Sequence, residues 1–349
     1  LGYIKRTPLA DFRAQSRGGV GSKGSSTRDA DFIEYIYPAT MHNTMLFFTA
    51  KGRCFWLKVY EIPEGTKNSK GRAVQNMLNI DPDDSVNACL HIRKLNDAEF
   101  CKSHYVMFCT KQGIVKKTCL TEYSRPRTNG VNAINIREDD RVVGVALTNG
   151  TDEIIIADRN GRAARFDENA VRAMGRTATG VRGFALDDDG EDEVVGMICV
   201  NDPENDTVMV VSEKGFGKRS AVEDYRKTNR GAKGVKTLDI TEKTGKVVAI
   251  KSVTDNDDLM IINKSGITIR MKLSDVRIQG RATQGVKLIE LKKRNEEISS
   301  VCKVPTEMEE EENGEQIDHL ENGVANTPLT DNDVNGNTVA EKSENNSNE

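Results

Sequence analysis

Basic residues are the groups in this sequence whose spacing points to chemistry, because they recur at matching positions of similar segments. In each segment Lys and Arg follow a Gly-centred turn, and they gather again around a Gly-Val-like step further along. Such side chains neutralise phosphate groups, whose spacing is the same for any base sequence. The predicted phosphate-binding residues are Lys5, Arg6, Lys70, Arg72, Lys116, Lys117, Arg127, Arg162, Arg165, Arg176, Arg182, Lys218, Arg219, Arg230, Lys233, Arg270, Lys272, Arg281 and Lys287.

A repeated unit of about fifty residues would position these side chains. Each unit is predicted to form a hairpin of two strands around a Gly turn, then a polar stretch, a Gly-Val strand and another apolar strand. The clearest hairpins span residues 152–166, 207–219 and 258–271. Weaker copies centre on Gly52 and Gly113, and a sixth opens the chain at Gly2.

Six such units predict an all-β domain over residues 1–304, a six-bladed propeller-like array of four-stranded blades. Repetition around an axis leaves few long unprotected strand edges. The first blade is expected to lack its first strand, because the sequence begins inside that unit. A row of independent small β domains is the alternative, but each unit carries too little apolar surface to fold alone.

Charge divides the chain into two parts. Residues 305–349 hold thirteen acidic residues and one Lys, a net charge of −12, whereas residues 1–304 hold 49 basic and 41 acidic residues, a net charge of +8. The acidic tail contains few apolar residues and is predicted to be disordered. Its contrast with the basic body argues against ordinary solvated surface charge as the explanation of the repeated Lys and Arg.

Catalytic and cofactor motifs are weak. Cys101, His104 and Cys109 lack a second close ligand pair for zinc, and the seven cysteines show no disulfide spacing. Residues 19–24 match a dinucleotide pattern formally, but a polar turn and a strand follow where a helix is required. We therefore expect no metal, no cofactor and no catalysis by this chain. No run of about 18 apolar residues predicts a membrane span, so we expect a cytoplasmic protein.

Duplex DNA is the favoured nucleic acid. Aromatic residues make up only 5% of the chain, too few for platforms on which single-stranded bases stack. Curving a duplex around a disc over about 40 base pairs costs on the order of 10 kcal/mol. Many phosphate contacts would have to offset that cost, which accounts for basic residues in every unit.

These features resemble the C-terminal domain of the bacterial DNA gyrase A subunit, with the topoisomerase IV A-subunit domain as a near relative. The marks are the opening Gly2-Tyr3-Ile4-Lys5-Arg6, the repeated hairpins and residues 15–21, which look like the gyrase-A box, Gln-Arg-Arg-Gly-Gly-Lys/Arg-Gly. The chain departs from it at Ser16 and Val20, where two positive charges are missing. The box residues that it keeps, with two nearby basic residues that could replace the charge, are Gln15, Arg17, Gly18, Gly19, Gly21, Lys23 and Arg28.

The resemblance implies a β-pinwheel that wraps duplex DNA around its rim, so that a gyrase holoenzyme can introduce negative supercoils. It implies that the box closes the first blade to the last, and that the acidic tail competes with DNA for the rim. The cleavage tyrosine and the ATPase would belong to other parts of the enzyme. The implied partners are the remaining gyrase A domains and the gyrase B subunit in an A2B2 assembly at the nucleoid, the fragment alone being monomeric.

Two alternatives remain at this point. A topoisomerase IV domain would position and bend DNA without strong wrapping, and it typically lacks a complete box. A protein-interaction propeller would present apolar patches on its faces instead of repeated charge on its rim.

Overall fold

The computed structural model describes residues 2–12, 14–19, 21–23, 36–66, 69–187, 190–291 and 296–304, all within one compact unit. The predicted acidic tail, Val20 and Arg28 lie outside these residues. Within this part of the chain no helix is long and apolar enough to cross a membrane.

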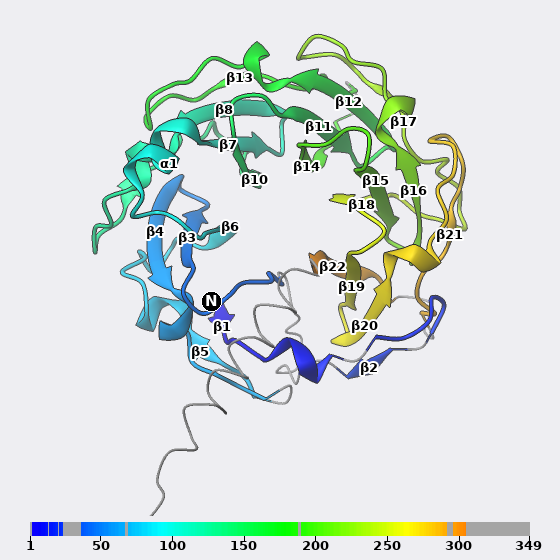
Figure 1. Cartoon of the computed structure of the whole chain (residues 1–349), viewed down its shortest axis with the longest axis horizontal. Helices are drawn as coiled ribbons and strands as arrows, with labels where there is room; N and C mark the ends of the chain where they lie inside the picture. Colours follow the sequence, from blue (N-terminus) through cyan, green and yellow to red (C-terminus); the bar gives the residue numbers. More distant parts are fainter. Residues whose placement is uncertain are drawn as a thin grey trace, which may run out of the picture. The chain divides into compact units, whose positions relative to one another are not determined.

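Five four-stranded antiparallel sheets form the body of the described chain, and Figure 1 shows them arranged around a common centre. Each sheet contains a central hairpin, an inner strand and a short outer strand. The hairpins are β3 (Thr44–Thr49) with β4 (Arg53–Lys58), β7 (Tyr105–Thr110) with β8 (Ile114–Cys119), β11 (Glu153–Asp158) with β12 (Arg162–Asp167), β15 (Thr207–Ser212) with β16 (Phe216–Ala221), and β19 (Asp258–Asn263) with β20 (Ile267–Lys272).

The inner strands are β6 (Val86–Ile92), β10 (Val142–Thr148), β14 (Val194–Val200), β18 (Val247–Val253) and β22 (Ile298–Val304). The outer strands are β9 (Val131–Asn132), β13 (Val181–Arg182), β17 (Val235–Lys236), β21 (Val286–Lys287) and β2 (Ser22–Lys23). Neighbouring inner strands from β6 to β22 contact one another in chain order, and apolar clusters fill the space between successive sheets. Both faces of most sheets are therefore buried.

The prediction of six four-stranded blades is wrong for one blade in the described residues. Its place is taken by the two-stranded sheet of β1 (Tyr3–Ile4) and β5 (Arg72–Ala73). These strands correspond to the second hairpin strand and the outer strand of the other sheets. The described residues contain no counterpart of the first hairpin strand or of the inner strand for this sheet.

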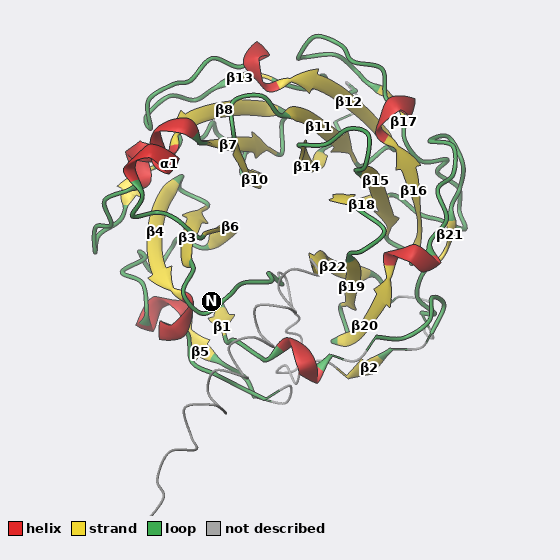
Figure 2. Ribbon diagram, in the orientation of Figure 1, coloured by secondary structure: helices red, strands yellow, loops and turns green. Residues whose placement is uncertain are grey.

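Short helical turns follow the five hairpins and also the strands β1 and β5, as Figure 2 shows in red. They are the 3₁₀ turns η1 (Leu9–Asp11), η2 (Val59–Glu61), η3 (Val74–Asn76), η4 (Leu120–Tyr123), η5 (Glu168–Ala170), η6 (Val222–Asp224) and η7 (Leu273–Asp275). The single α-helix of the described chain, α1 (Ala98–Ser103), precedes β7.

Each outer strand pairs with the hairpin of the preceding unit, which the sequence did not reveal. Thus β13 follows the hairpin of β11 and β12 along the chain but pairs with β8 of the preceding unit. In the same way β17 follows β15 and β16 but pairs with β12. Glycine permits this close approach: a Cβ on Gly180 would lie 2.5 Å from the carbonyl oxygen of Val115, at a φ of +107°. Glycines with positive φ precede all six short strands of this kind, at Gly21, Gly71, Gly130, Gly180, Gly234 and Gly285.

The hairpin turns also follow one design, in which the last residue of the first strand caps the start of the second. Asp158 Oδ1 accepts a hydrogen bond from the backbone N–H of Arg162 at 2.6 Å, and Asn263 Oδ1 accepts one from Ile267 at 2.8 Å. Burial, with a further contribution from the nearby carboxylate of Asp192, raises the pKa of Asp158 to about 7.

Replacing Asp158 by Asn is expected to stabilise the protein above pH 7 and to change little near pH 4. The folded-state pKa lies above the ordinary Asp value of about 3.9, so the wild type loses stability as the pH rises from about 4 to about 7, at up to about 1.4 kcal/mol per pH unit. The amide keeps the turn bond, as Asn263 does, and does not titrate. Urea unfolding across this range measures the difference, and a free-energy difference independent of pH would contradict the argument.

Candidate nucleic-acid interface

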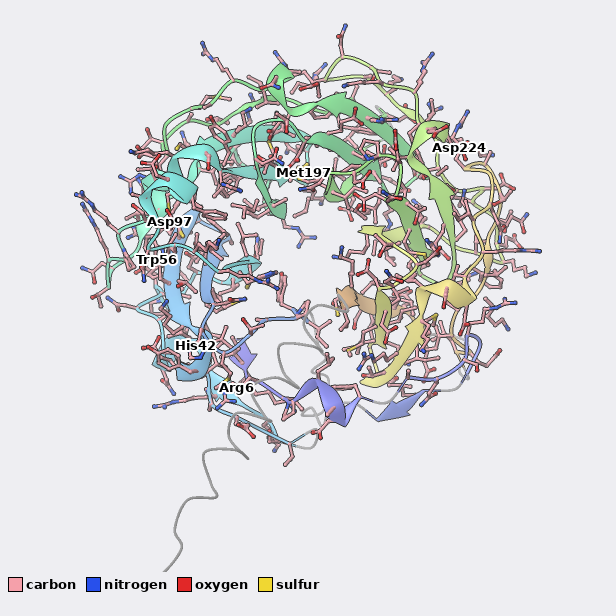
Figure 3. All side chains as sticks on the ribbon, viewed as in Figure 1. Arg6, His42, Trp56, Asp97, Met197 and Asp224 are labelled. Atoms are coloured by element: carbon pink, nitrogen blue, oxygen red, sulfur yellow. The ribbon has the colours of Figure 1, made fainter. Side chains whose placement is uncertain are left out.

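The outer strands and the loops before them form six outer segments, residues 15–23, 69–73, 125–132, 175–182, 229–236 and 280–287. Together these segments contain thirteen basic residues and no Asp or Glu. Figure 3 shows side chains with nitrogen tips projecting outward along this edge. The predicted basic residues of these segments that are exposed are Arg17, Lys70, Arg72, Arg127, Arg182, Arg230, Lys233 and Lys287.

The other three predicted basic residues of these segments, Arg176, Arg281 and Lys23, are not among the exposed side chains described. Arg176 and Arg281 are half-buried, and Arg281 Nη1 donates to the carbonyl oxygen of Lys236 at 2.8 Å. Arg230 Nη1 makes the equivalent bond to Arg182 at 3.0 Å, so these arginines also join neighbouring outer segments. Lys23 pairs with Ile267 through its backbone, and its side chain is outside the description.

Most basic residues of the hairpins do not reach the surface, which corrects their predicted place on a rim. Lys116, Lys117, Lys218, Arg219 and Arg270 are all buried, and the Arg165 side chain is 12% exposed. The reason is that blades bury both faces of a sheet, so alternation along a strand leaves no solvent side. Arg162 and Lys272, at opposite ends of their strands, are exposed, and Lys5 and Arg6 are half-buried.

These buried side chains join successive units. Arg219 Nη1 donates to the carbonyl oxygens of Leu273 at 3.0 Å and Val276 at 3.4 Å, in and after η7 of the next unit. Arg219 also contacts Asp255 at 2.5 Å. Its five N–H groups suit this role, because a guanidinium can satisfy several carbonyl groups at once.

The same position makes the same connection in every unit around the ring. The remaining donor and acceptor pairs are Arg6 to Ile62 at 2.8 Å, Trp56 to Tyr123 at 2.9 Å, Lys117 to Glu168 at 3.3 Å, Arg165 to Val222 at 3.0 Å and Arg270 to Phe12 at 3.2 Å. We call these residues the ring tethers. The last of them, Arg270, connects the final hairpin to the start of the chain.

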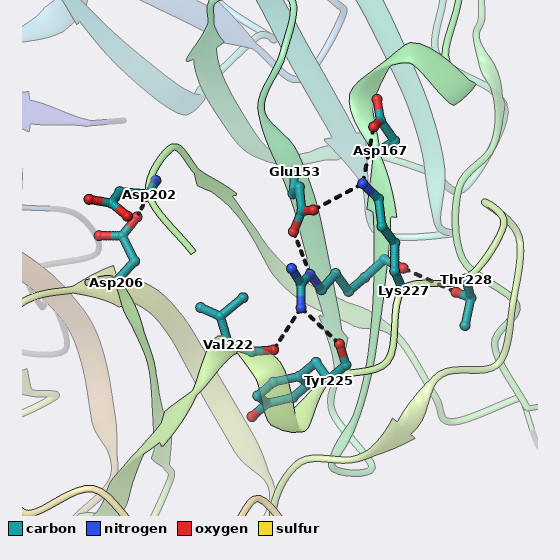
Figure 4. A network of polar contacts seen from close by, with 9 residues as sticks. Glu153, Asp167, Asp202, Asp206, Val222, Tyr225, Lys227 and Thr228 are labelled. Atoms are coloured by element: carbon teal, nitrogen blue, oxygen red, sulfur yellow. Dashed lines mark hydrogen bonds and ion pairs between the residues drawn. The ribbon is translucent and has the colours of Figure 1, made fainter. Parts of the chain in front are cut away.

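Figure 4 shows one tether in its surroundings. Arg165 contacts Glu153 at 2.5 Å and donates to the carbonyl oxygens of Val222 and Tyr225. Lys227 lies between Glu153, at 3.0 Å, and Asp167, at 3.2 Å. Two cations and two carboxylates thus neutralise one another, which leaves Arg165 no free charge for a phosphate.

A second row of lysines binds the outer segments from inside. Lys116 Nζ donates to the carbonyl oxygens of Ala133 at 2.5 Å and Arg176 at 2.6 Å, and Lys218 Nζ donates to Gly280 at 2.8 Å. Burial lowers the pKa of Lys116 to about 7 and that of Lys218 to about 8. These lysines hold the outer segments in place and face away from solvent.

Residues 15–19 and 21–23, which contain the described part of the predicted box, lie along the last hairpin. The backbone N–H of Gln15 donates to Arg270 at 2.7 Å, and that of Gly18 donates to Leu288 at 2.7 Å. Beyond them β2 pairs with β20. Arg17 and Gly18 are exposed beside this seam, whereas Gly19 and Gly21 are half-buried against the last unit. The expected contact between the box and the last unit is therefore present.

Sequence reasoning missed several exposed basic residues. Lys236 occupies the same outer-strand position as Arg182 and Lys287, and Arg125 lies in the segment of Arg127. Arg172, Arg226 and Arg277 each follow the residue that ends a 3₁₀ turn, and all three are exposed. Aligning every unit on its turn glycine would have identified them.

The seven cysteines carry free thiols, and Cys101 and Cys109 are buried. Among the described residues no group of three or more His, Cys, Asp or Glu side chains is placed to hold a metal ion.

Comparison with known proteins supports one family over most of the chain. The family described as DNA gyrase C-terminal domain, β-propeller, matches residues 1–40, 43–93, 104–149, 152–201, 206–254 and 257–301. These six segments agree with the repeated units, and the gap between residues 93 and 104 contains α1.

Curated relatives and solved structures agree with this match. The DNA gyrase A subunit from Staphylococcus aureus strain MRSA252 is 42% identical over 321 residues, 92% of this chain and 35% of the relative. The chain thus spans about a third of that relative. A DNA gyrase A C-terminal domain structure has a TM-score of 0.77 at 23% identity, covering 87% of this chain and 96% of its own. A DNA topoisomerase IV C-terminal domain has 0.68 at 25%, covering 91% and 95%.

Proposed function

The chain belongs to the DNA gyrase C-terminal domain family, and from this membership we propose that it binds duplex DNA along its outer segments and curves it around the ring. The proposal extends to wrapping that lets a gyrase holoenzyme introduce negative supercoils. The domain itself would be non-catalytic.

The observation that carries the proposal is the charge of the outer segments. They hold thirteen basic residues and no acidic residue, and at least one exposed Lys or Arg occurs in each of the six. Phosphates on a curved duplex would meet these side chains in succession, without contacts that read base edges. The ring tethers hold the sheets that carry the segments, so they act on DNA only through the shape of the ring.

The proposed partners are duplex DNA, the other gyrase A domains and the gyrase B subunit in an A2B2 assembly. The cytoplasm, at the nucleoid, is the proposed location, and the isolated domain is proposed to be a monomer. The acidic residues 305–349 would compete with DNA for the outer segments, since their charge opposes that of the body.

Binding to a random-sequence duplex is expected to weaken steeply with salt, and replacing Arg72 and Arg182 by Gln should weaken it further. Both arginines are exposed on outer strands. Each phosphate contact contributes about −0.9 to the slope of log affinity against log salt. The slope of the double variant should therefore be less negative than that of the wild type by up to about 1.8. Fluorescence anisotropy on a duplex of fixed length at several salt concentrations measures both quantities.

Replacing Lys94 and Lys102 by Gln provides the matched control, since both lysines are exposed and neither lies on an outer segment. This control should keep the wild-type slope. A flat salt response of the wild type would refute DNA binding by the outer segments, and equal slopes for the two double variants would refute the assignment of Arg72 and Arg182.

A further inference from the structure

Two lysines of the outer strands are held by carboxylates of their own units. Lys236 Nζ lies 2.5 Å from Asp239 Oδ1, and Lys287 Nζ lies 2.8 Å from Glu290 Oε2. In both cases the carboxylate follows its lysine by three residues. The position three residues after Arg182 is Ala185, and neither Arg72 nor Arg182 forms an ion pair with another described residue.

The carboxylates lie where one outer segment meets the next. The backbone N–H of Asp239 donates to Thr283 at 3.1 Å, and that of Glu290 donates to Gly19 at 3.1 Å. Asp239 Oδ2 also accepts a hydrogen bond from Gln284 at 3.4 Å. A duplex passing from one outer segment to the next would therefore pass beside Asp239 and then beside Glu290.

An exposed ammonium group can bond to a carboxylate or to a phosphate, and the two anions compete for it. The side chains of Lys236 and Lys287 are 55% and 45% exposed, so phosphate can reach both. The hydrogen bond from Lys236 lowers the pKa of Asp239, which keeps this competitor charged at neutral pH.

We propose that Asp239 and Glu290 compete with DNA phosphate for Lys236 and Lys287, which divides the outer segments into an open arc and a screened arc. The open arc carries Arg72 and Arg182, and the screened arc carries the pairs Lys236–Asp239 and Lys287–Glu290. Lys233, in the same outer segment as Lys236, is also paired, with Asp187 at 3.1 Å. This inference rests on the proposed DNA binding. DNA engages the open arc, and the screened arc contributes little as long as its lysines remain paired with the carboxylates.

The test compares the wild-type chain with D239N/E290Q on a duplex of about 150 base pairs, the persistence length of DNA. Freeing two lysines is expected to tighten binding by about twofold to tenfold, because exposed ion pairs are worth little individually. The slope of log affinity against log salt should become more negative by up to about 1.8, because two more phosphates are neutralised and each contributes about −0.9.

Two controls separate screening from a general change of charge. E204Q/E223Q removes the same charge from exposed carboxylates outside the outer segments and should leave the slope unchanged. K236Q/K287Q should weaken wild-type binding little, and it should abolish the gain when added to D239N/E290Q.

A D239N/E290Q slope equal to that of E204Q/E223Q would overturn the proposal. So would a gain that survives K236Q/K287Q. Either result leaves salt-dependent binding by the wild type intact, so failure of the screening proposal is distinguishable from failure of DNA binding.

Discussion

Replacing Arg219 by Met is expected to lower the free energy of unfolding by about 3 to 5 kcal/mol. The side chain is 2% exposed, and its guanidinium donates to Thr207, Leu273 and Val276. Met fills a similar volume but leaves these buried oxygens without donors. Urea unfolding, with the slope checked for a constant change in exposed surface, measures the loss.

Arg182→Met is the matched comparison, because the same substitution is made at an exposed outer strand. Its stability should stay within about 0.5 kcal/mol of wild type, while its DNA affinity falls. Arg219→Met should lower the stability and leave the DNA affinity unchanged, provided that binding is measured under conditions in which this variant is still folded. If the Arg219 variant kept its stability and lost DNA affinity, Arg219 would have to be assigned to the DNA-binding surface and not to the ring tethers.

The contrast between these two arginines shows how far the sequence could be interpreted. The fifty-residue repeat, the hairpins and the turn glycines were predictable, because β-strand alternation and positive φ leave local signals such as Gly161. The family is confirmed as well, by a match that covers most of residues 1–301. The sequence indicated that the first blade is incomplete, but it did not reveal that β5 is the only described strand that pairs with β1.

Burial of the hairpin cations escaped prediction for a physical reason. Lys116 and Lys117 are adjacent, so alternation predicts that at least one of them faces solvent. Packing between blades buries both, and the carbonyl oxygens of Ala133 and Glu168 that accept their hydrogen bonds come from distant segments. Only the fold brings those acceptors near, so sequence spacing alone could not separate ring tethers from surface charge.

The seam that closes the ring depends on one glycine. Gly21 has a φ of +76°, and a Cβ there would lie 2.8 Å from both Ile267 Cγ2 and the carbonyl oxygen of Thr268. Gly18 has a φ of +75°, but a Cβ at that position would meet no atom within 4 Å. The two glycines therefore share a backbone conformation and differ only in how closely β20 approaches.

Replacing Gly21 by Ala is expected to open the seam, whereas Gly18→Ala should leave it closed. Both changes cost about 1 to 2 kcal/mol for an Ala with positive φ, and the clash at Gly21 adds about 1 to 3 kcal/mol. Relieving that clash requires β2 to move off β20, which exposes the backbone amides that pair Ser22 with Thr268. Hydrogen exchange at Thr268 should accelerate in the Gly21 variant and not in the Gly18 variant. Equal exchange in the two variants would mean that the box residues, and not the strand pairing beyond them, close the ring.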